Sequence, residues 1–515
     1  MAHLGSRRRR AIALPAGLAL TASLGFLPAG AASAAPGGSA SAVTTAAVVK
    51  TDGPKLSYVV NVKSGSHTAK TVKKAIARAG GSIVIAYDQI GVIVVHSQNP
   101  EFAETIRTVR GVVSAGATRT APLTTAMDNS VGTVSPLSAP EAKKAAARAA
   151  ADQDPLEPLQ WGLPAIKADQ AHKRTLGSKK VTVAVLDTGV DDTHPDLAPN
   201  FDQRASANCV TGKPDTTPGS WRPAANESSH GTHVAGTIAA AKNGIGVTGV
   251  APGVKVSGIK VSTTAGFFYT ESIVCGFIWA AENGVEVTNN SYYVDPWLFN
   301  CKNDPDQKAL VEAVSRATRY AERKGAVNVA AAGNSRMDLA AAKLTDVTSP
   351  NDSTPGTREI DPKVCLDIPT QLPGVVTTSS LGAKNLKSSF SNYGDGVVDI
   401  SAPGGDSTVF QKPDAPATDG RILSTLPNGR YGYSAGTSMA SPHVAGVVAL
   451  IKSKHPGASP AALKALLYAQ ADDKACTNPY DINGDGVVDA VCEGGKTKNG
   501  FYGTGVTDAL DAVRR

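Results

Sequence analysis

Short runs of β-branched residues alternate with helix-forming stretches from Trp161 to the end of the chain. Six such runs are "VTVAVLD", "VKVSGIKV", "VEVTNNS", "AVNVAAAGN", "GVVTTSS" and "VVDISAPG", and helical patterns such as "QKALVEAVSRATRYAERKG" separate them. Strands that alternate with helices predict an α/β fold, a parallel sheet with helices on both faces. Ligands of such sheets bind outside the carboxyl ends of the strands, so we expect the chemistry there.

A different pattern precedes this one between residues 57 and 117. The order is strand, helix, two strands, helix and strand, in which "TAKTVKKAIARAGG" is a helix that ends at Gly80 and Gly81. This βαββαβ order is typical of a ferredoxin-like α+β domain. Residues 121 to 150 are rich in Ala, Thr, Ser and Pro and are expected to form a linker, although "APEAKKAAARAAA" has helix propensity.

The first 34 residues have the layout of a signal peptide. Four arginines at 7 to 10 precede an apolar run, and "AASAAP" offers small residues for cleavage after Ala34. Pro15 and Pro28 interrupt the apolar run, and a membrane-spanning helix needs about 20 predominantly apolar residues. No later segment meets that requirement, so we expect a soluble, exported, extracellular protein.

Charge is distributed unevenly along the chain. Residues 1 to 150 contain 17 Lys and Arg against 6 Asp and Glu, whereas residues 151 to 515 contain 34 against 38. A basic first part and an acidic remainder predict two pieces that attract each other. The same balance argues against a nucleic-acid-binding protein.

Six cysteines lie beyond residue 200, and none has the spacing of a CxxC metal site. An even number in an exported chain predicts three disulfides. The sequence leaves the pairing open, and Cys476 with Cys492 is the local pair that we favour.

Three short motifs contain candidates for catalysis. Asp187 ends the run "VTVAVLD", although an Asp before a turn is common. In "SSHGTHVAGT", His230 and His233 lie at a helix start, where the helix dipole favours a neutral imidazole that can accept a proton. Ser438, in "AGTSMASPHVAG", also lies at a helix start, where it could be an N-cap or could offer a free backbone N–H to an anion.

Together "VAVLDTGVD", "HGTHVAGT" and "GTSMASPHVAG", in that chain order, resemble the subtilisin family of serine peptidases, and the resemblance covers nearly all of residues 155 to 515. It implies that Ser438 is the nucleophile, that His230 is the general base and acid, and that Asp187 orients the imidazole. The segment "AVNVAAAGNS" matches the family's oxyanion segment, which makes Asn334 the side-chain donor.

The resemblance also implies a cleft in which the substrate backbone pairs as an added strand between residues 264 to 268 and 290 to 294. Many relatives have small residues where this chain has Phe267, Phe268, Tyr293 and Val294, and the bulk of these side chains is expected to narrow the pockets or reshape the rim. The usual preference for large apolar residues is therefore in doubt. The expected substrate contacts are Gly266, Phe267, Ser291, Tyr292, Tyr293, Ala331, Ala332 and Gly333.

Two stretches suggest structural calcium, and no organic cofactor is expected. The first matches the family's strong calcium site, with Asp196 and Asn243 as side-chain ligands, carbonyls of Ala241, Ile245 and Val247, and Glu157 where the family often has Gln. The second, "DINGDGVVD", alternates oxygen-bearing residues in the manner of a calcium loop. Its candidate ligands are Asp481, Asn483, Asp485 and Asp489. Position twelve of this loop is Cys492 instead of Glu, and a polar turn is the alternative.

These observations predict four parts. They are a signal peptide at 1–34, a prosegment at 35–122, a linker at 123–150 that is removed with it, and a catalytic domain at 151–515 that includes the cysteine-bracketed loop at 476–492. The resemblance implies that the prosegment is an intramolecular inhibitor removed by self-cleavage, and its positive charge suits docking on an acidic domain.

The expected function is that of a secreted serine endopeptidase, which is made as a self-processing zymogen and acts through an acyl-enzyme. Its partners are protein or peptide substrates and its own prosegment, with no nucleic acid, no membrane and a monomeric state. Two alternatives stay open: an exopeptidase that releases short peptides from N-termini, and an inert binding module with the same fold.

Overall fold

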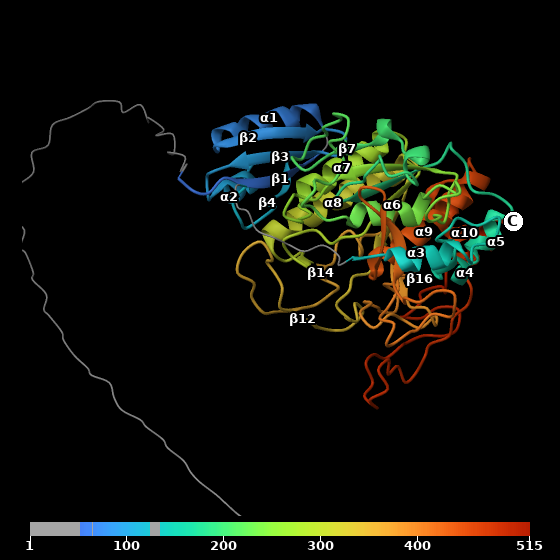
Figure 1. Cartoon of the computed structure of the whole chain (residues 1–515). Helices are drawn as coiled ribbons and strands as arrows, with labels where there is room; N and C mark the ends of the chain where they lie inside the picture. Colours follow the sequence, from blue (N-terminus) through green and yellow to red (C-terminus); the bar gives the residue numbers. More distant parts are fainter. Residues whose placement is uncertain (1–51, 64, 124–133, 515) are drawn as a thin grey trace, which may run out of the picture. The chain divides into compact units, whose positions relative to one another are not determined.

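The computed structural model describes residues 52–63, 65–123 and 134–514 (Figure 1). The predicted signal peptide at 1–34 lies outside the described residues. Among the helices of the described part, none combines the length and the apolar character that crossing a membrane requires.

The central element is a sheet of seven strands in the order β16-β15-β11-β9-β6-β8-β7. Every pairing in it is parallel, as predicted. In chain order the strands are β6 (Thr182–Asp187), β7 (Ala207–Asn208), β8 (Lys255–Lys260), β9 (Val287–Asn290), β11 (Val327–Ala331), β15 (Val376–Leu381) and β16 (Ile400–Pro403). Six of them correspond to the six β-branched runs, and the short edge strand β7 is an addition.

Helices cover both faces of this sheet, which confirms the predicted α/β class. Successive residues of β6 alternate between two apolar clusters: Val183 and Val185 pack with α6 (His230–Ala239) and α9 (Thr437–Lys454). Leu186 packs on the opposite face with α7 (Thr270–Glu282) and α8 (Pro305–Arg323). Side chains of a strand point alternately to the two faces, so a strand buried on both sides must be apolar throughout. The remaining helices of this body are η1 (Glu157–Leu159), α4 (Gly162–Ala165), α5 (Ala168–His172), η2 (Ala198–Asn200), η3 (Gln203–Ala205), α10 (Pro460–Ala469) and α11 (Ala509–Arg514).

The N-terminal unit has the predicted βαββαβ order. Its elements are β1 (Leu56–Val62), α1 (Ser66–Arg78), β2 (Gly81–Tyr87), β3 (Val92–Ser97), α2 (Phe102–Arg107) and β4 (Val112–Ala117). The strands form an antiparallel sheet in the order β2-β3-β1-β4. Val72 and Ile76 of α1 and Phe102 and Ile106 of α2 are buried against one face of it.

The other face of this small sheet packs on α7 and α8. Val59, Val92 and Val94 belong to the same apolar cluster as the buried residues of those two helices. The N-terminal unit therefore covers two helices that would otherwise face outward.

Part of the expected linker is regular structure. Ser135–Pro136 form β5, which pairs with β18 (Arg430–Ser434) and thereby joins the hairpin of β17 (Ile422–Leu426) and β18. Ala139–Ala146 form α3, capped by the hydroxyl of Ser138. Because β5 depends on a partner strand almost 300 residues away in the sequence, no local pattern indicates it.

All six cysteines are paired, which confirms the prediction of three disulfides. The pairs are Cys209–Cys275, Cys301–Cys365 and Cys476–Cys492. The second pair joins β10 (Asn300–Cys301) to β14 (Cys365–Leu366), and β12 (Leu344–Asp346) pairs with β13 (Arg358–Ile360) nearby.

Candidate active site

Asp187 and His230 meet where β6 ends and α6 begins. Nδ1 of His230 lies 2.8 Å from Oδ1 of Asp187, and both side chains are buried. The backbone N–H of Thr188 donates to the same oxygen at 2.7 Å and holds the carboxylate in place. A proton on Nδ1 that is donated to Asp187 leaves Nε2 as the nitrogen that can accept one.

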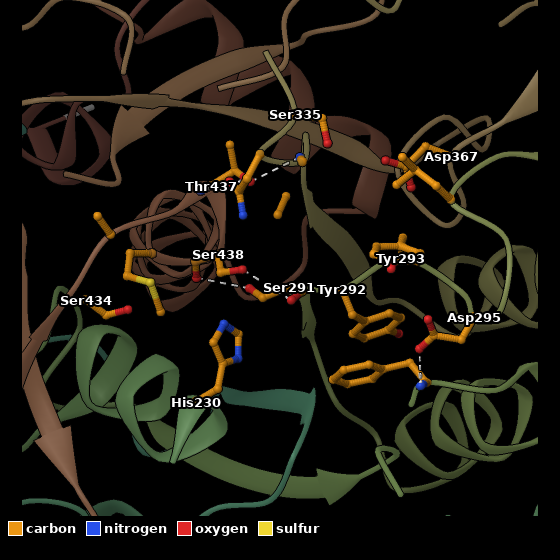
Figure 2. Close-up of a pocket in the computed structure, with 17 residues that line it drawn as sticks. His230, Ser291, Tyr292, Tyr293, Asp295, Ser335, Asp367, Ser434, Thr437 and Ser438 are labelled. Carbon is orange, nitrogen blue, oxygen red and sulfur yellow. Dashed lines mark hydrogen bonds between the residues drawn. The ribbon is translucent and has the colours of Figure 1, made fainter. Parts of the chain in front are cut away.

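Ser438 is the second residue of α9, and Figure 2 shows it across from the ring of His230. Its Oγ donates to the carbonyl of Ser291 at 3.3 Å, and the hydroxyl of Ser291 donates to the carbonyl of Ser438 at 3.1 Å. Ser438 and His230 line the same cavity, with the hydroxyl bonded to Ser291 instead of to the imidazole. Catalytic hydrogen bonds are often long before substrate binds.

Two hydrogen-bond donors face a common space beside Ser438. The backbone N–H and the hydroxyl of Thr437 both donate to Oδ1 of Asn334, at 2.9 and 2.8 Å, which leaves Nδ2 of Asn334 free to donate elsewhere. A Cβ placed on Gly436 would lie 3.5 Å from that Nδ2 and 3.6 Å from the backbone nitrogen of Ser438. The backbone N–H of Ser438 is in the first turn of α9, where helix N–H groups have no partner within the helix. A small anion in this space could accept from both groups.

The other polar residues of these motifs have structural roles. His233 bonds through Nε2 to the carbonyls of Ile422 and Gly432, and burial lowers its pKa to about 3. Burial likewise lowers the pKa of His443 to about 4. The hydroxyl of Ser441 donates to Asn289 at 2.7 Å.

A cavity of about 250 Å³ opens between His230, Ser438 and Asn334. Of the expected substrate contacts, the structure places five on its lining, Ser291, Tyr292, Tyr293, Ala331 and Gly333.

Three expected contacts, Gly266, Phe267 and Ala332, are absent from the described lining of that cavity. Phe267 is buried and stacks on Tyr269 with ring centroids 5.6 Å apart. Phe268 does line the cavity and stacks on Tyr292 at 4.8 Å, so these aromatic rings form one of its walls.

The sequence analysis missed several residues of this cavity. Asp295, Leu298, Ser335 and Asp367 all line it. Figure 2 shows Asp367 beside Tyr293, on the far side of the cavity from His230. The one local signal for Asp367 is a single carboxylate within the otherwise uncharged run "CLDIP".

Comparison with known proteins places the chain in a family. A sequence profile described as the Subtilase family matches residues 178–503. The chain belongs to the subtilase family. It is 34% identical over 332 residues to Subtilisin Savinase of Lederbergia lenta, an alignment that covers 64% of this chain and 97% of the relative. It is 35% identical over 298 residues to Subtilisin E of Bacillus subtilis, covering 58% of this chain and 62% of the relative.

Solved structures share the fold. The epidermin leader peptide processing serine protease of Staphylococcus aureus matches with a TM-score of 0.63 and 24% identity, covering 89% of this chain and 98% of that one. Fervidolysin from Fervidobacterium pennivorans, described as a keratinolytic enzyme related to subtilisin, matches with a TM-score of 0.60 over 90% of this chain and 61% of that one. The family assignment makes this subtilase a serine-type peptidase.

The first candidate calcium loop of this subtilase contains a buried carboxylate with one unsatisfied oxygen. Among the described residues, none donates to Oδ1 of Asp196, whereas Oδ2 accepts from the backbone N–H of Val247 at 2.9 Å. Burial raises the pKa of Asp196 to about 6. An oxygen-seeking cation beside it would compensate the buried charge, so Asp196 fits the expectation.

Glu157, unlike Asp196, already has partners within the protein and is therefore a poor calcium ligand. Its Oε2 pairs with Nζ of Lys242 at 2.7 Å and accepts from the hydroxyl of Thr248 at 3.3 Å. Oδ1 of Asn243 accepts from the backbone N–H of Ile245 at 3.1 Å. In this subtilase a lysine thus neutralises the carboxylate that replaces the family's glutamine.

The second candidate loop differs because its carboxylates bond to their own backbone. Asp481 accepts from the N–H groups of Gly484, Asp485 and Gly486, at 2.7 to 3.2 Å. Oδ2 of Asp489 accepts from Ile482 at 2.9 Å, and Asn483 donates to Asp485. Among the residues described, no three acidic, histidine or cysteine side chains converge as metal ligands.

Proposed function

We propose that this subtilase is a secreted serine endopeptidase that hydrolyses internal peptide bonds through an acyl-enzyme and is made as a self-processing zymogen. The observation that carries the proposal is the convergence of His230, Ser438 and Asn334 on one cavity, with Asp187 bonded to His230. A binding module with the same fold would not need the two donors of the anion site together with an oriented imidazole.

The first chemical step forms a bond between Oγ of Ser438 and the carbonyl carbon of the substrate. His230 accepts the hydroxyl proton on Nε2, and Asp187 stabilises the imidazolium that results. The carbonyl oxygen becomes an oxyanion, which accepts hydrogen bonds from Nδ2 of Asn334 and the backbone N–H of Ser438. These donors lie 3.5 and 3.6 Å from the same point beside Gly436, which supports this role.

Collapse of the tetrahedral intermediate breaks the peptide bond. His230 gives its proton to the leaving amine, and the acyl group stays on Ser438. Water then attacks the ester, with His230 again as base and then acid, and the carboxylic product leaves with the serine restored. The same residues serve both halves of the reaction.

We further propose that the N-terminal unit is the inhibitor of the zymogen. Its last residues bond to the body: the backbone N–H of Thr120 donates to Asp352 at 2.9 Å, and Asp352 also accepts from the hydroxyl of Tyr269, the residue after Phe268 of the cavity wall. Release of this unit requires cleavage of an internal bond, so self-processing is itself an endopeptidase reaction.

Calcium at the loop of Asp196 is part of the proposal, in a structural role. Asp196 and Asn243, with carbonyls of Ala241, Ile245 and Val247, would hold the ion, and Asp481, Asn483, Asp485 and Asp489 are the ligands proposed for the second loop. Bound calcium would neutralise the buried Asp196 carboxylate and stiffen its loop. It takes no part in the peptidase steps.

The test combines a serine-directed fluorophosphonate probe with two peptides of equal sequence, one acetylated at its N-terminus and one free. We expect labelling that is lost in Ser438→Ala, and equal cleavage of both peptides at an internal bond. Cleavage of the free peptide alone would identify an exopeptidase. No labelling and no cleavage would identify an inert binding module.

A further inference from the structure

The cavity beside Ser438 contains a buried carboxylate that no described residue pairs. Asp367 is 2% exposed, lines the cavity, and turns its oxygens toward it (Figure 2). Its Oδ1 has no hydrogen-bond partner. A Cβ placed on Gly333 would lie 3.5 Å from Oδ2, so the carboxylate adjoins the segment that leads to Asn334.

Asp295, the second carboxylate on the cavity lining, differs from Asp367 because both of its oxygens accept hydrogen bonds. Oδ2 of Asp295 accepts from the backbone N–H of Phe268 at 2.5 Å, and Oδ1 accepts from Nδ2 of Asn351 at 2.7 Å. Asp295 therefore joins the two segments on which the cavity wall is built. Asp367 has no comparable partners.

No protein cation compensates Asp367. Burial raises its pKa well above the usual value, and among the described residues no lysine, arginine or histidine opposes that shift. An ionised carboxylate buried without a partner is costly, and buried charges in proteins are normally paired. A ligand that brings a positive charge into the cavity would remove this cost.

The backbone around Asp367 is nevertheless firmly held. Its N–H donates to Oε1 of Gln371 at 2.8 Å, and the N–H of Gln371 donates back to its carbonyl at 2.8 Å. Two residues upstream, the disulfide Cys301–Cys365 fastens β14 to β10. The backbone that carries the carboxylate is thus fixed in advance of any ligand, which lowers the entropic cost of binding.

We infer that Asp367 determines specificity, by selecting a lysine or arginine at the substrate position whose carbonyl Ser438 attacks. The inference rests on the proposed peptidase reaction. The carbonyl bound between Asn334 and Ser438 belongs to the residue whose side chain enters this adjoining cavity. Its aliphatic stem would lie along Tyr292 and Leu298, and its charged end would meet Asp367.

The lining suits such a side chain along its whole length. Lysine and arginine combine an apolar stem with a charged head, and here the apolar groups of Tyr292 and Leu298 share the lining with the unpaired carboxylate of Asp367. Arginine can form two parallel hydrogen bonds to a carboxylate, whereas lysine acts as a point charge. A large apolar side chain would fill the walls but would leave Asp367 without a partner.

The experiment compares acetylated peptides that differ at this position alone, with arginine, lysine, leucine, phenylalanine or norleucine. Norleucine keeps much of the lysine stem without the charge. We expect kcat/KM for the better basic residue to exceed that for norleucine by about 30-fold or more, since loss of one partner of a buried charge pair has at least that effect. Equal rates, or a preference for leucine or phenylalanine, would overturn the inference.

Two variants locate the effect. Asp367→Asn should lose the basic preference, so that kcat/KM for the better basic residue falls to about that for norleucine, because an amide of the same shape has no charge to offer. Asp361→Asn removes an exposed carboxylate from the same segment and should keep the preference. An unchanged preference in Asp367→Asn would assign it to another group.

A third measurement needs no variant. Benzamidine should inhibit cleavage of the norleucine peptide by the wild type competitively, and benzamide, its neutral counterpart, should do so at least tenfold more weakly. Equal inhibition by both would contradict the inference. The peptidase proposal fails separately, if the fluorophosphonate probe leaves Ser438 unlabelled and no peptide is cut.

Discussion

The N-terminal unit and the seven-stranded body both pack helices on a sheet, but they complete their cores in different ways. The body covers both faces of its sheet with its own helices. The N-terminal unit covers one face with α1 and α2 and lays the other on α7 and α8 of the body. Only the body is therefore self-sufficient, because the unit has a sheet face that needs a partner.

The contacts between them are also of a different kind from those within the body. Nη1 of Arg316 donates to the carbonyls of Val62, Ile90 and Gly91 at 2.8 to 3.1 Å. Arg107 pairs with Asp306. The hydroxyl of Tyr87 donates to the carbonyl of Gly212 at 2.7 Å.

The most buried ion pair between the described residues of the two parts joins Arg119 to Glu271. The two side chains are 8% and 2% exposed, and the guanidinium of Arg119 also lies 3.8 Å from the ring centroid of Tyr269. When two parts separate, water can solvate the exposed charged groups, whereas exposed apolar surface stays unfavourable in water. The comparison indicates that a unit that is later released can be held by polar contacts around a small apolar patch, whereas a permanent core is apolar throughout.

The largest effect expected concerns whether the unit leaves at all. Ser438→Ala should lower kcat by about 10⁶-fold, and the secreted variant should keep its N-terminal unit while the wild type loses roughly the first 150 residues. Intact mass of both products checks this. Ser441→Ala is the matched control, because its hydroxyl bonds only to Asn289 and its loss should leave processing intact. Equal masses for Ser438→Ala and the wild type would mean that self-cleavage does not occur.

A smaller effect is expected from the anion site. Asn334→Ala should lower kcat by about 10²- to 10³-fold with little change in KM, because the lost donor acts on charge that develops in the transition state. Self-processing should slow by a similar factor. Ser335→Ala, next along the same lining, should stay within a few-fold of the wild type. Steady-state kinetics on one blocked peptide measures both, and a rise in KM alone in Asn334→Ala would assign Asn334 to substrate binding.

Periodicity and motif were sufficient to predict the main sheet and the order of the N-terminal unit. Each β-branched run is buried on both faces, as in "VTVAVLD" of β6, so local composition and final environment agree. The strand β5 shows where this fails, since Ser135–Pro136 is extended only because β18 offers it a partner. Such pairing is set by tertiary structure and leaves no period in the sequence.

The same distinction applies to the site. Asp187, His230 and Ser438 were found because each follows a recognisable strand end or helix start. Asp367 has no such signal, because an Asp among loop residues is usually part of a turn. It reaches the cavity only through the pairing of β14 with β10, which the disulfide Cys301–Cys365 fixes.

The attraction between the two parts can be tested at their buried ion pair. Arg119→Met should weaken the complex of the cleaved unit with the body by about 10²-fold, since removing one partner leaves Glu271 buried and unpaired. Native mass spectrometry of the cleaved, unseparated product measures this. Lys73→Met removes a charge whose partner, Asp88, lies within the unit, and should leave the complex unchanged. If both variants weakened the complex equally, the loss of affinity would be due to the change in net charge and not to the ion pair.

The same pair predicts a direction with pH. Burial alone would raise the pKa of Glu271, but the charge of Arg119 overrides it and holds that pKa below the usual value. A carboxylate whose pKa is lowered in the complex stabilises it above the pKa of the separated state, and that contribution is lost as pH falls. Acidification should therefore release the unit from the wild type, and should have less effect on Arg119→Met. Release that grows as pH rises from neutral would contradict this assignment.

The smallest expected effect is a loss of thermal stability when calcium is removed, and it concerns the body instead of the N-terminal unit. All candidate ligands lie in the body, so a chelator should lower the Tm of the mature protein by several degrees, because an ion at 100 times its Kd contributes about 2.7 kcal/mol. Asp196→Asn should abolish most of this shift, since its Oδ1 is the buried oxygen without a partner. Asp485→Asn, in the exposed loop whose carboxylates already bond to backbone, should remove only the smaller part of the shift that the second loop contributes. If Asp485→Asn and not Asp196→Asn removed the shift, the calcium that stabilises this body would be the one in the C-terminal loop, and the buried Asp196 would be a carboxyl that holds a proton instead of a metal.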